Sequence, residues 1–225
     1  MKPTTRFGRI DTVTQVLREE YSGPERDWLP PERALANELK VSRPLLREAI
    51  KRLQMQGYLE PIHGVGVKVV HHPTAPIKTL LENEISSVLD QKRQFAELRC
   101  LVEPQIAAWA ALNAATDPKT VIRLRSIHVR MRTAPTYEDK VTFDIDFHRT
   151  LAELAQNQVL SLMLSAVADI ELQSRTHTLA AVGVNVALHQ HESILIAIES
   201  GDAATAKNAM QTHVNAASEA HLASD

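Results

Sequence analysis

Apolar side chains in the first 56 residues recur with helical spacing in three short segments. The first segment is expected to be a helix over 9–21, the second a short helix after Pro31, and the third a helix over 43–56. The positions that share a face are Ile10, Val13, Val16 and Leu17 in the first segment, Leu35, Ala36 and Leu39 in the second, and Leu46, Ala49, Ile50 and Leu53 in the third. This periodicity predicts three short helices packed around one small core.

The residues between the second and third segments are typical of a tight turn. Residues 40–43 form this turn, and Ser42 is a natural N-cap for the helix that follows. The outer face of that helix is basic and carries Arg43, Arg47, Lys51 and Arg52. Two short helices joined by a short turn, the second of them basic, predict a helix-turn-helix.

Two short β-like runs follow Gly57. They occupy 58–62 and 65–70, and the dipeptide His63-Gly64 lies between them at the expected tip. A β-hairpin directly after a helix-turn-helix forms a wing. The N-terminal segment is therefore predicted to be a winged helix-turn-helix.

From residue 77 onward, apolar residues recur with the spacing of successive amphipathic helices, and no strand pattern competes. The expected helices cover 77–90, 94–115, 117–132, 136–155, 159–180, 184–200 and 202–221. Asp117, Asn157 and Asp202 lie where helix caps are expected. With only 7 glycines and 4% aromatic residues, the chain does not suit a β-sandwich or barrel. We expect a mostly α fold in which the winged helix-turn-helix, with its small hairpin, precedes an all-α bundle of six to seven helices.

The charge distribution divides the chain at a proline-containing segment. Residues 1–76 carry 12 Lys and Arg against 9 Asp and Glu, whereas residues 77–225 carry 13 against 18. A basic head on an acidic body suggests that the head binds an anion. We therefore expect a DNA-binding domain over 1–72, a linker over 73–76 and a second domain over 77–225.

The cysteine count and the hydropathy exclude several classes of protein. The single cysteine, Cys100, leaves no disulfide framework and no cysteine-based zinc finger. No apolar run approaches the roughly 18 residues of a membrane span, and the first residues lack the apolar stretch of a secretion signal. We expect a cytoplasmic protein with no membrane partner.

The motifs of the N-terminal segment resemble the winged-helix domain of GntR-family transcription regulators. The resemblance rests on LPPERALA at 29–36, VSRPLLREAI at 41–50, Leu53 and Gly57, and it covers about 60 residues in the family's order and spacing. It implies DNA contacts from Arg33, Arg43, Arg47 and the wing-tip Gly64 and, through the fatty-acid-responsive branch of the family, from Ser42 and His63. The sequence departs from the family at Pro31, where a capping Ser is usual, and at Pro44, where a small hydroxyl residue is common.

The chemistry of these residues suits a role in DNA binding. Arg43 and Arg47 are four residues apart, so they share a face at the start of the helix that would enter the major groove. An arginine can donate two hydrogen bonds to O6 and N7 of a guanine. Gly64 would let the wing backbone approach the sugar-phosphate chain closely. The alternative is a solvated helix face whose arginines pair with acids such as Glu48 or Glu38.

Four candidate metal ligands lie on the expected helices of the second domain. Asp144 and His148 are four residues apart and share a helix face, while His191 and His213 lie among apolar neighbours on later helices. Three imidazoles and one carboxylate that converge inside a helical bundle suit Zn²⁺, with Ni²⁺ or Mn²⁺ as alternatives. From spacing alone, a set of histidines satisfied by ordinary hydrogen bonds stays an open alternative.

This half of the chain resembles the FCD domain, the all-helical ligand-binding domain of the FadR subfamily of GntR regulators. The landmarks are ELR at 97–99, EP at 103–104, DIDFH at 144–148, Asn157, His191 before Gly201-Asp202, and His213. Members that keep the Asp and the three His bind a divalent metal, so the resemblance implies that Asp144, His148, His191 and His213 bind one. His189 and Asp146 are left out because they point to other helix faces.

The same resemblance implies that Arg99 lies near the ligand pocket, where its planar fork would hold an effector carboxylate. An ion pair with Glu103, four residues further on, is the alternative interpretation of Arg99.

Together these features predict a metabolite-responsive transcription regulator, a repressor as is usual in this subfamily, and not an enzyme. We expect a homodimer on pseudo-palindromic double-stranded operator DNA, and a small organic acid effector that binds the metal and Arg99. A metal-dependent enzyme is a rival class, because open metal positions can activate water, but no general base stands out beside the four ligands. A third hypothesis is a purely structural metal.

Overall fold

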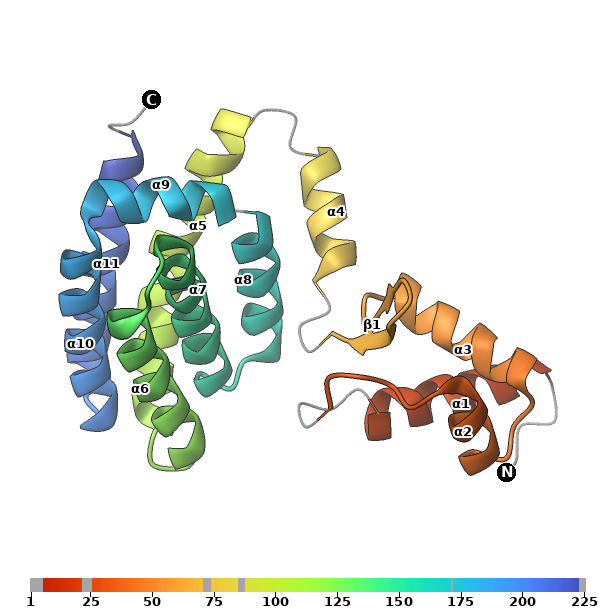
Figure 1. The fold of residues 1–225 in the computed structure, drawn as a ribbon. Helices are drawn as coiled ribbons and strands as arrows, with labels where there is room; N and C mark the ends of the chain where they lie inside the picture. Colours follow the sequence, from red (N-terminus) through yellow and green to blue (C-terminus); the bar gives the residue numbers. More distant parts are fainter. Residues whose placement is uncertain (1–5, 22–25, 71–73, 85–87, 171, 223–225) are drawn as a thin grey trace. The chain divides into compact units, whose positions relative to one another are not determined.

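The computed structural model describes residues 6–21, 26–70, 74–84, 88–170 and 172–222 of the chain (Figure 1). The chain divides into two compact units, Met1–Thr79 and Leu80–Asp225. This division falls inside helix α4 (Ala75–Glu84). Residue 73 of the linker expected over 73–76 lies outside the described residues, and residues 75 and 76 belong to α4. Pro76 is tolerated in the first turn of that helix, because its missing N–H removes no hydrogen bond there.

The N-terminal unit is a winged helix-turn-helix, as the sequence predicts. Its elements are α1 (Arg6–Tyr21), α2 (Glu32–Glu38), α3 (Arg43–Met55), β1 (Leu59–Ile62) and β2 (Gly66–Val69). The core holds the apolar face of each helix, with Leu17, Leu35, Leu46 and Leu53 fully buried. The three helical periods found in the sequence therefore meet in one core.

Local capping fixes where the second helix of the motif begins. Ser42 precedes α3 as its N-cap, and its hydroxyl accepts a hydrogen bond from the Leu45 backbone N–H at 3.4 Å. Pro44 lies in the first turn of α3, where it is tolerated for the same reason as Pro76. Pro31 precedes α2 in the N-cap position and offers no side-chain hydrogen bond. The expected turn is thus present, with its cap at one helix only.

The wing is an antiparallel pair in which Leu59 lies opposite Val69 and Ile62 opposite Gly66. A third segment pairs with its outer edge, because the Leu29 N–H donates to the Val67 carbonyl at 2.9 Å and the Val69 N–H donates to the Asp27 carbonyl at 2.8 Å. This pairing covers part of an otherwise open strand edge. It joins the wing to the chain just before α2.

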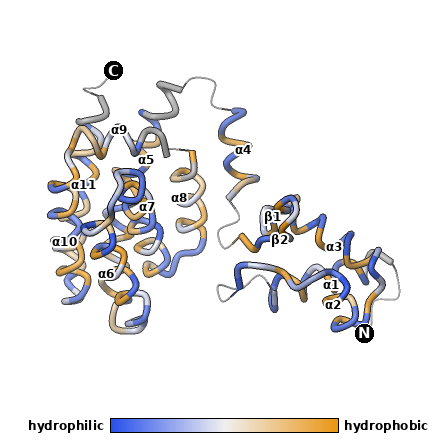
Figure 2. The backbone as a smooth tube through the Cα atoms, viewed as in Figure 1, coloured by the Kyte–Doolittle hydropathy of each residue, from blue (hydrophilic) through white to orange (hydrophobic). Residues whose placement is uncertain are grey.

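The C-terminal unit is an all-helical bundle, again as predicted. Its helices after α4 are α5 (Val88–Asn113), α6 (Pro118–Thr133), α7 (Tyr137–Leu154), α8 (Gln158–Ile170), α9 (Leu172–Val182), α10 (Val184–Glu199) and α11 (Ala203–Leu222). Hydrophobic and hydrophilic residues alternate along these helices (Figure 2). The apolar faces of α5, α7, α10 and α11 form the main core, in which Phe147, Leu151 and Ile194 are fully buried.

Three of the expected caps are present as hydrogen bonds. The side chains of Asp117, Asn157 and Asp202 each accept from a backbone N–H three residues later, at 3.1, 3.1 and 3.0 Å. The single helix expected over 159–180 is wrong, because the structure has α8 and α9 there, running in different directions (Figure 1). The two halves pack on different neighbours, α8 on α7 and α9 on α11.

Among the described residues, no helix is both long enough and apolar enough to cross a membrane.

Candidate metal centre and nucleic-acid interface

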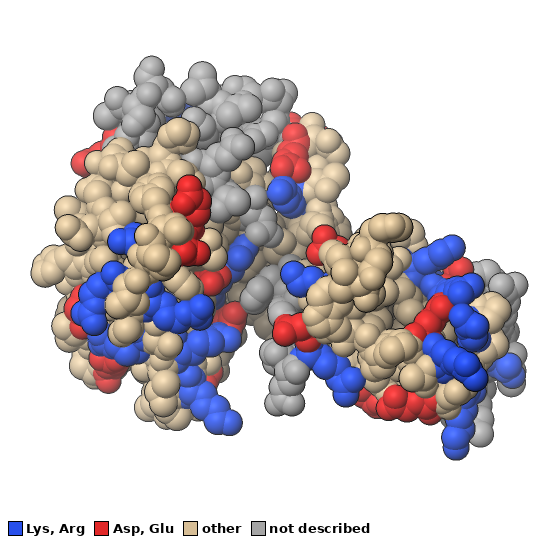
Figure 3. Space-filling model, in the orientation of Figure 1, with Lys and Arg blue, Asp and Glu red and all other residues tan. Residues whose placement is uncertain are grey.

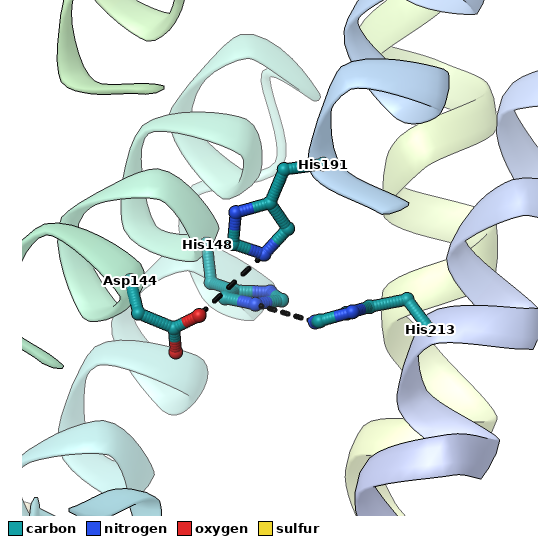
Figure 4. Close-up of side chains that lie close together, drawn as sticks. All are labelled: Asp144, His148, His191 and His213. Carbon is teal, nitrogen blue, oxygen red and sulfur yellow. Dashed lines mark hydrogen bonds and ion pairs between the residues drawn. The ribbon is translucent and has the colours of Figure 1, made fainter. Parts of the chain in front are cut away.

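The four residues named as metal ligands lie together in the C-terminal unit. Asp144 and His148 project from α7, His191 from α10 and His213 from α11, and their side chains point toward one another (Figure 4). One ligand atom from each lies within 4.8 Å of the others, and all four residues are buried. Spacing of four on α7 puts its two ligands on one face, while α10 and α11 each supply one imidazole. The geometry is that of a four-ligand cluster.

Polar groups outside the cluster lie close to the ring nitrogens of two of the imidazoles. Nδ1 of His148 lies 2.7 Å from a carboxylate oxygen of Glu103, and Nδ1 of His213 lies 2.9 Å from Oε1 of Gln190. A carboxylate can only accept, so the proton of His148 belongs on Nδ1. With Gln190 accepting in the same way, both Nε2 atoms carry lone pairs, and these atoms face each other at 3.2 Å. Two facing lone pairs fit a cation or a proton between them.

His191 completes the cluster from the third helix. Its ring stacks on Phe147, with centroids 4.0 Å apart and planes 8° from parallel, so its orientation is set by packing. Its Nε2 lies 3.5 Å from Oδ1 of Asp144, and neither of its buried ring nitrogens has a hydrogen-bond partner within the described part of the chain. A buried polar atom left without a partner is rare in folded proteins. This orphaned ring is the second observation that fits a metal.

The electrostatics hold these groups in the ionisation states that a metal needs. Burial is the largest cause that lowers the pKa of all three histidines, and it takes that of His213 to about 3. Burial alone would raise the pKa of Asp144, but the positive charge of the neighbouring Arg175 is the largest opposing cause, and that pKa lies below its ordinary value. Neutral imidazoles beside an ionised carboxylate are the forms that bind a divalent cation.

Two buried charges next to the cluster were not assigned a role there from the sequence. Glu103 accepts from Nε of Arg99 at 2.6 Å and lies 3.8 Å from Nη2 of Arg175, whose Nη1 donates to Asp144 at 2.9 Å. Arg99, Glu103 and Arg175 are 7%, 2% and 6% exposed. One feature of the sequence indicated that Arg175 is buried. It lies four residues before Leu179, and therefore on the apolar face of a helix.

A small cavity opens beside the cluster within the C-terminal unit. Its polar lining consists of Arg99, Asp144, Arg175, Thr178 and His213, and the rest of its wall is apolar. Arg99 pairs with Glu103, as the alternative interpretation expected, and it also lines this cavity. The guanidinium groups of Arg99 and Arg175 therefore line the same cavity as Asp144 and His213 of the cluster.

Other residues of the same kind lie outside the cluster. His189, which the spacing excluded, is exposed, and Asp146 is half-buried. His128 is buried on α6, where its Nε2 lies 3.0 Å from a carboxylate oxygen of Glu192. In the described part of the chain, the cluster contains the four predicted residues and no fifth one.

The residues named for DNA contact lie in the N-terminal unit. Lys and Arg side chains gather there over the part that carries α2 and α3, with acidic side chains among them (Figure 3). Arg33 is exposed on α2, Ser42 is exposed at the start of α3, and Arg43 and Arg47 are exposed on the first turns of α3. His63 and Gly64 are exposed in the turn between β1 and β2, and Gly64 has a φ of +75°. A side chain would strain this backbone, which explains the glycine at the tip.

Arg43 and Arg47 of α3 are exposed but lie beside an acidic partner. Arg47 donates to both carboxylate oxygens of Glu32, at 2.6 and 3.0 Å, and Nη2 of Arg43 lies 3.5 Å from Glu32. Glu48 and Glu38 were the partners expected from the sequence, whereas Glu32 of α2 lies beside these arginines in the structure. Tyr21 donates to Glu38 at 2.7 Å instead.

Two families match the two units of the chain. Residues 94–216 match the family described as "FCD domain", and residues 15–69 match "Bacterial regulatory proteins, gntR family". The HTH-type transcriptional repressor NanR of Escherichia coli K12 is 28% identical over 214 residues, which cover 92% of this chain and 81% of NanR. NanR of Citrobacter rodentium is 27% identical over 220 residues, with 92% and 82% covered.

Two solved structures share the fold. The GntR protein of Streptococcus agalactiae superposes with a TM-score of 0.67 at 23% identity. The superposition covers 96% of this chain and 100% of the other. A GntR transcriptional regulator of Rhodococcus sp. RHA1 superposes with a TM-score of 0.52 at 21% identity, covering 96% and 99%. At these identities the likeness concerns the fold alone.

Proposed function

The chain belongs to the GntR family of bacterial regulatory proteins and carries an FCD domain, and on that premise we propose that it represses transcription until a small organic acid binds beside a divalent metal. Members of this family are DNA-binding transcription regulators that respond to metabolites, and not enzymes. The observation that carries the proposal is the convergence of Asp144, His148, His191 and His213 in the same chain as a winged helix-turn-helix.

In the N-terminal unit, we assign base contacts to the start of α3 and backbone contacts to its surroundings. Arg43 and Arg47 would reach base edges in the major groove, since they are exposed on the first two turns of α3. Arg33 and Ser42 would contact phosphates. His63 and Gly64 would place the wing against the sugar-phosphate chain. Two copies of the chain, as a homodimer, would bind the two half-sites of a pseudo-palindrome.

In the C-terminal unit, the four-residue cluster would hold the metal, with Zn²⁺ as the first candidate and Ni²⁺ or Mn²⁺ as alternatives. The support is the donor set itself: three neutral imidazoles and one ionised carboxylate, with Nε2 atoms turned inward and an unpartnered His191. Beside four protein ligands, Zn²⁺ would take a further ligand by expanding to five-coordinate, and Ni²⁺ or Mn²⁺ would keep positions open in a six-coordinate shell. The metal would supply a Lewis acid to which an anion can bind.

The effector would enter the cavity that Arg99 and Arg175 line beside the cluster. A carboxylate suits this space, because a guanidinium can donate two parallel hydrogen bonds to it. The apolar part of the wall limits the effector to a small molecule. Such a ligand changes DNA binding only if it binds the DNA-competent and incompetent states with different affinity.

The test uses full-length protein and a duplex that it selects from a random-sequence pool. Metal-free and Zn²⁺-loaded protein are titrated with a panel of small mono- and dicarboxylic acids while duplex binding is followed by fluorescence anisotropy. We expect one acid or more to weaken duplex binding only when Zn²⁺ is bound. An equal response without Zn²⁺ would mean that the metal is structural, and failure of wild-type protein to enrich any sequence would overturn the regulator itself. Sedimentation measures the oligomeric state with and without the duplex. A monomer under both conditions would contradict the proposed homodimer.

A further inference from the structure

A single carboxylate connects the two arginines that start α3. Glu32 is the first residue of α2, and it lies 15 residues before Arg47 in the chain. Its Oε1 accepts from Nε of Arg47 at 2.6 Å, and its Oε2 accepts from Nη2 of Arg47 at 3.0 Å. The same Oε2 lies 3.5 Å from Nη2 of Arg43. The hydrogen bond from Arg47 is the main cause that lowers the pKa of Glu32, so this carboxylate is ionised at neutral pH.

The atoms that Glu32 uses decide which part of Arg47 stays available. A guanidinium carries five N–H groups in a rigid plane. Glu32 takes the side edge, formed by Nε and one hydrogen of Nη2. The end edge, with one N–H on each Nη atom, has no hydrogen bond to the described part of the chain. Its two parallel donors can reach O6 and N7 of a guanine.

The pair contributes little to the stability of the fold. Glu32 is 27% exposed and Arg47 is 59% exposed, and ion pairs this close to solvent are worth little in stability. Its consequence is conformational, because an unpaired arginine would sample many rotamers and would lose that freedom on binding a base. A second consequence is electrostatic, since a carboxylate beside two arginines reduces their attraction for any phosphate, whatever the sequence.

We propose that Glu32 is a specificity-determining residue, which holds Arg47, and more loosely Arg43, in position for a base edge and keeps both from phosphates of unrelated DNA. The inference rests on the proposed function, because it assumes that α3 enters the major groove. Glu32 itself makes no base contact in this arrangement. It acts through the two arginines, and it therefore changes discrimination between sequences more than total affinity.

The chain offers a matched control on the same helix. Asp11 of α1 pairs with Arg52, in the last turn of α3, with Oδ1 and Nη1 2.5 Å apart. Both Glu32→Gln and Asp11→Asn replace one carboxylate by an amide of the same shape. The first removes the carboxylate beside Arg47 and Arg43, and the second removes the one beside Arg52. The net charge of the domain rises equally in the two variants. Only Glu32 lies at the arginines proposed to contact bases.

The experiment compares full-length wild type, Glu32→Gln and Asp11→Asn on two duplexes at one salt concentration. The first duplex is the one that wild type selects from a random-sequence pool, and the second has the same composition in shuffled order. We expect Glu32→Gln to lower the ratio of the two affinities about tenfold, as one weakened bidentate base contact would. The shuffled duplex should be bound as tightly as by wild type or more tightly, and Asp11→Asn should keep the ratio within about twofold.

A second readout identifies the base contact. Replacing guanines of the selected duplex by 7-deazaguanine removes the N7 acceptor, and the most damaging replacement should weaken wild type more than it weakens Glu32→Gln. An unchanged affinity ratio in Glu32→Gln, or an equal fall in Asp11→Asn, overturns the inference. If wild type selects no sequence at all, the proposed function fails first and the inference with it.

Discussion

The carboxylate of Glu103 lies 2.7 Å from Nδ1 of His148, with both side chains buried in the C-terminal unit. Burial by itself would raise the pKa of Glu103, but Arg99 and His148 hold that pKa well below its ordinary value. An ionised Glu103 fixes the proton of His148 on Nδ1 and turns the lone pair of Nε2 toward the cluster. Carboxylates in this position are common behind metal-bound histidines, where they set tautomer and basicity.

Glu103→Gln should therefore weaken metal binding without unfolding the protein. The amide can donate to Nδ1 and thereby favour the wrong tautomer, so we expect the affinity for Zn²⁺ to fall about 10–100-fold. Competition with a chromophoric chelator measures it. The matched control is Glu97→Gln on the same helix, since Glu97 is exposed and pairs with Arg93 one turn earlier. Equal affinities in the two variants would remove Glu103 from the site.

The lowered histidine pKa values predict an acid-sensitive metal-free protein. His213 has a pKa of about 3 when folded and about 6.5 when unfolded, so between these values the unfolded chain binds the extra proton. The free energy of unfolding should then fall with decreasing pH, by up to about 1.4 kcal/mol per pH unit below about 6.5 for this one group. Urea unfolding at pH 7.5 and pH 5.5 measures the slope. His213→Gln should reduce this slope, and an unchanged slope in that variant would contradict the prediction.

Much of this fold follows from local features that a sequence displays. Ser42 and Asp117 cap helices because of chemistry within three residues of themselves, and the apolar face of α3 is set by its own period. Apolar neighbours indicated that the histidines of the cluster point inward, and spacing of four placed Asp144 and His148 on one face. Spacing alone left ordinary hydrogen-bonded histidines open, and the resemblance to the FCD domain selected the four residues as one set.

What the sequence did not indicate depends on contacts between distant segments. The pairing of 27–29 with the wing uses backbone atoms alone, so no side chain marks it. Glu103 and Arg175 are charged, and a polarity pattern assigns such residues to the surface. Their burial is stabilised by each other and by Arg99 and Asp144, across three helices. The pairing of Glu32 with Arg47 depends in the same way on how α2 packs against α3.

Substitutions should distinguish the residues that contact bases from those that contact the DNA backbone. Arg43→Ala or Arg47→Ala should cost about 1–3 kcal/mol on the selected duplex and flatten the preference for it. Arg33→Ala should weaken selected and shuffled duplexes alike, because a phosphate contact carries no sequence information. Anisotropy titrations at several salt concentrations measure both effects. The logarithm of the binding constant should fall less steeply with the logarithm of the salt concentration in Arg33→Ala than in wild type. Full affinity and preference in both α3 variants would rule out α3 as the recognition helix.

The metal centre itself gives the most direct prediction. Asp144→Asn and His191→Gln should each lose the metal and the response to the effector together, since each removes one of the four ligands. The control is His189→Gln, which makes the same change as His191→Gln two residues away on the same helix, at an exposed position.

Elemental analysis of the purified proteins should find about one divalent ion per chain in wild type and in His189→Gln, and far less in the two ligand variants. Because the ion binds only the folded state, an excess of about 100 times its Kd should add about 2.7 kcal/mol to the free energy of unfolding. For a chain of this size that raises Tm by roughly 5–10 °C, and the rise should be absent from Asp144→Asn and His191→Gln. Full occupancy and an undiminished rise in both variants would show that the ion binds elsewhere in the protein.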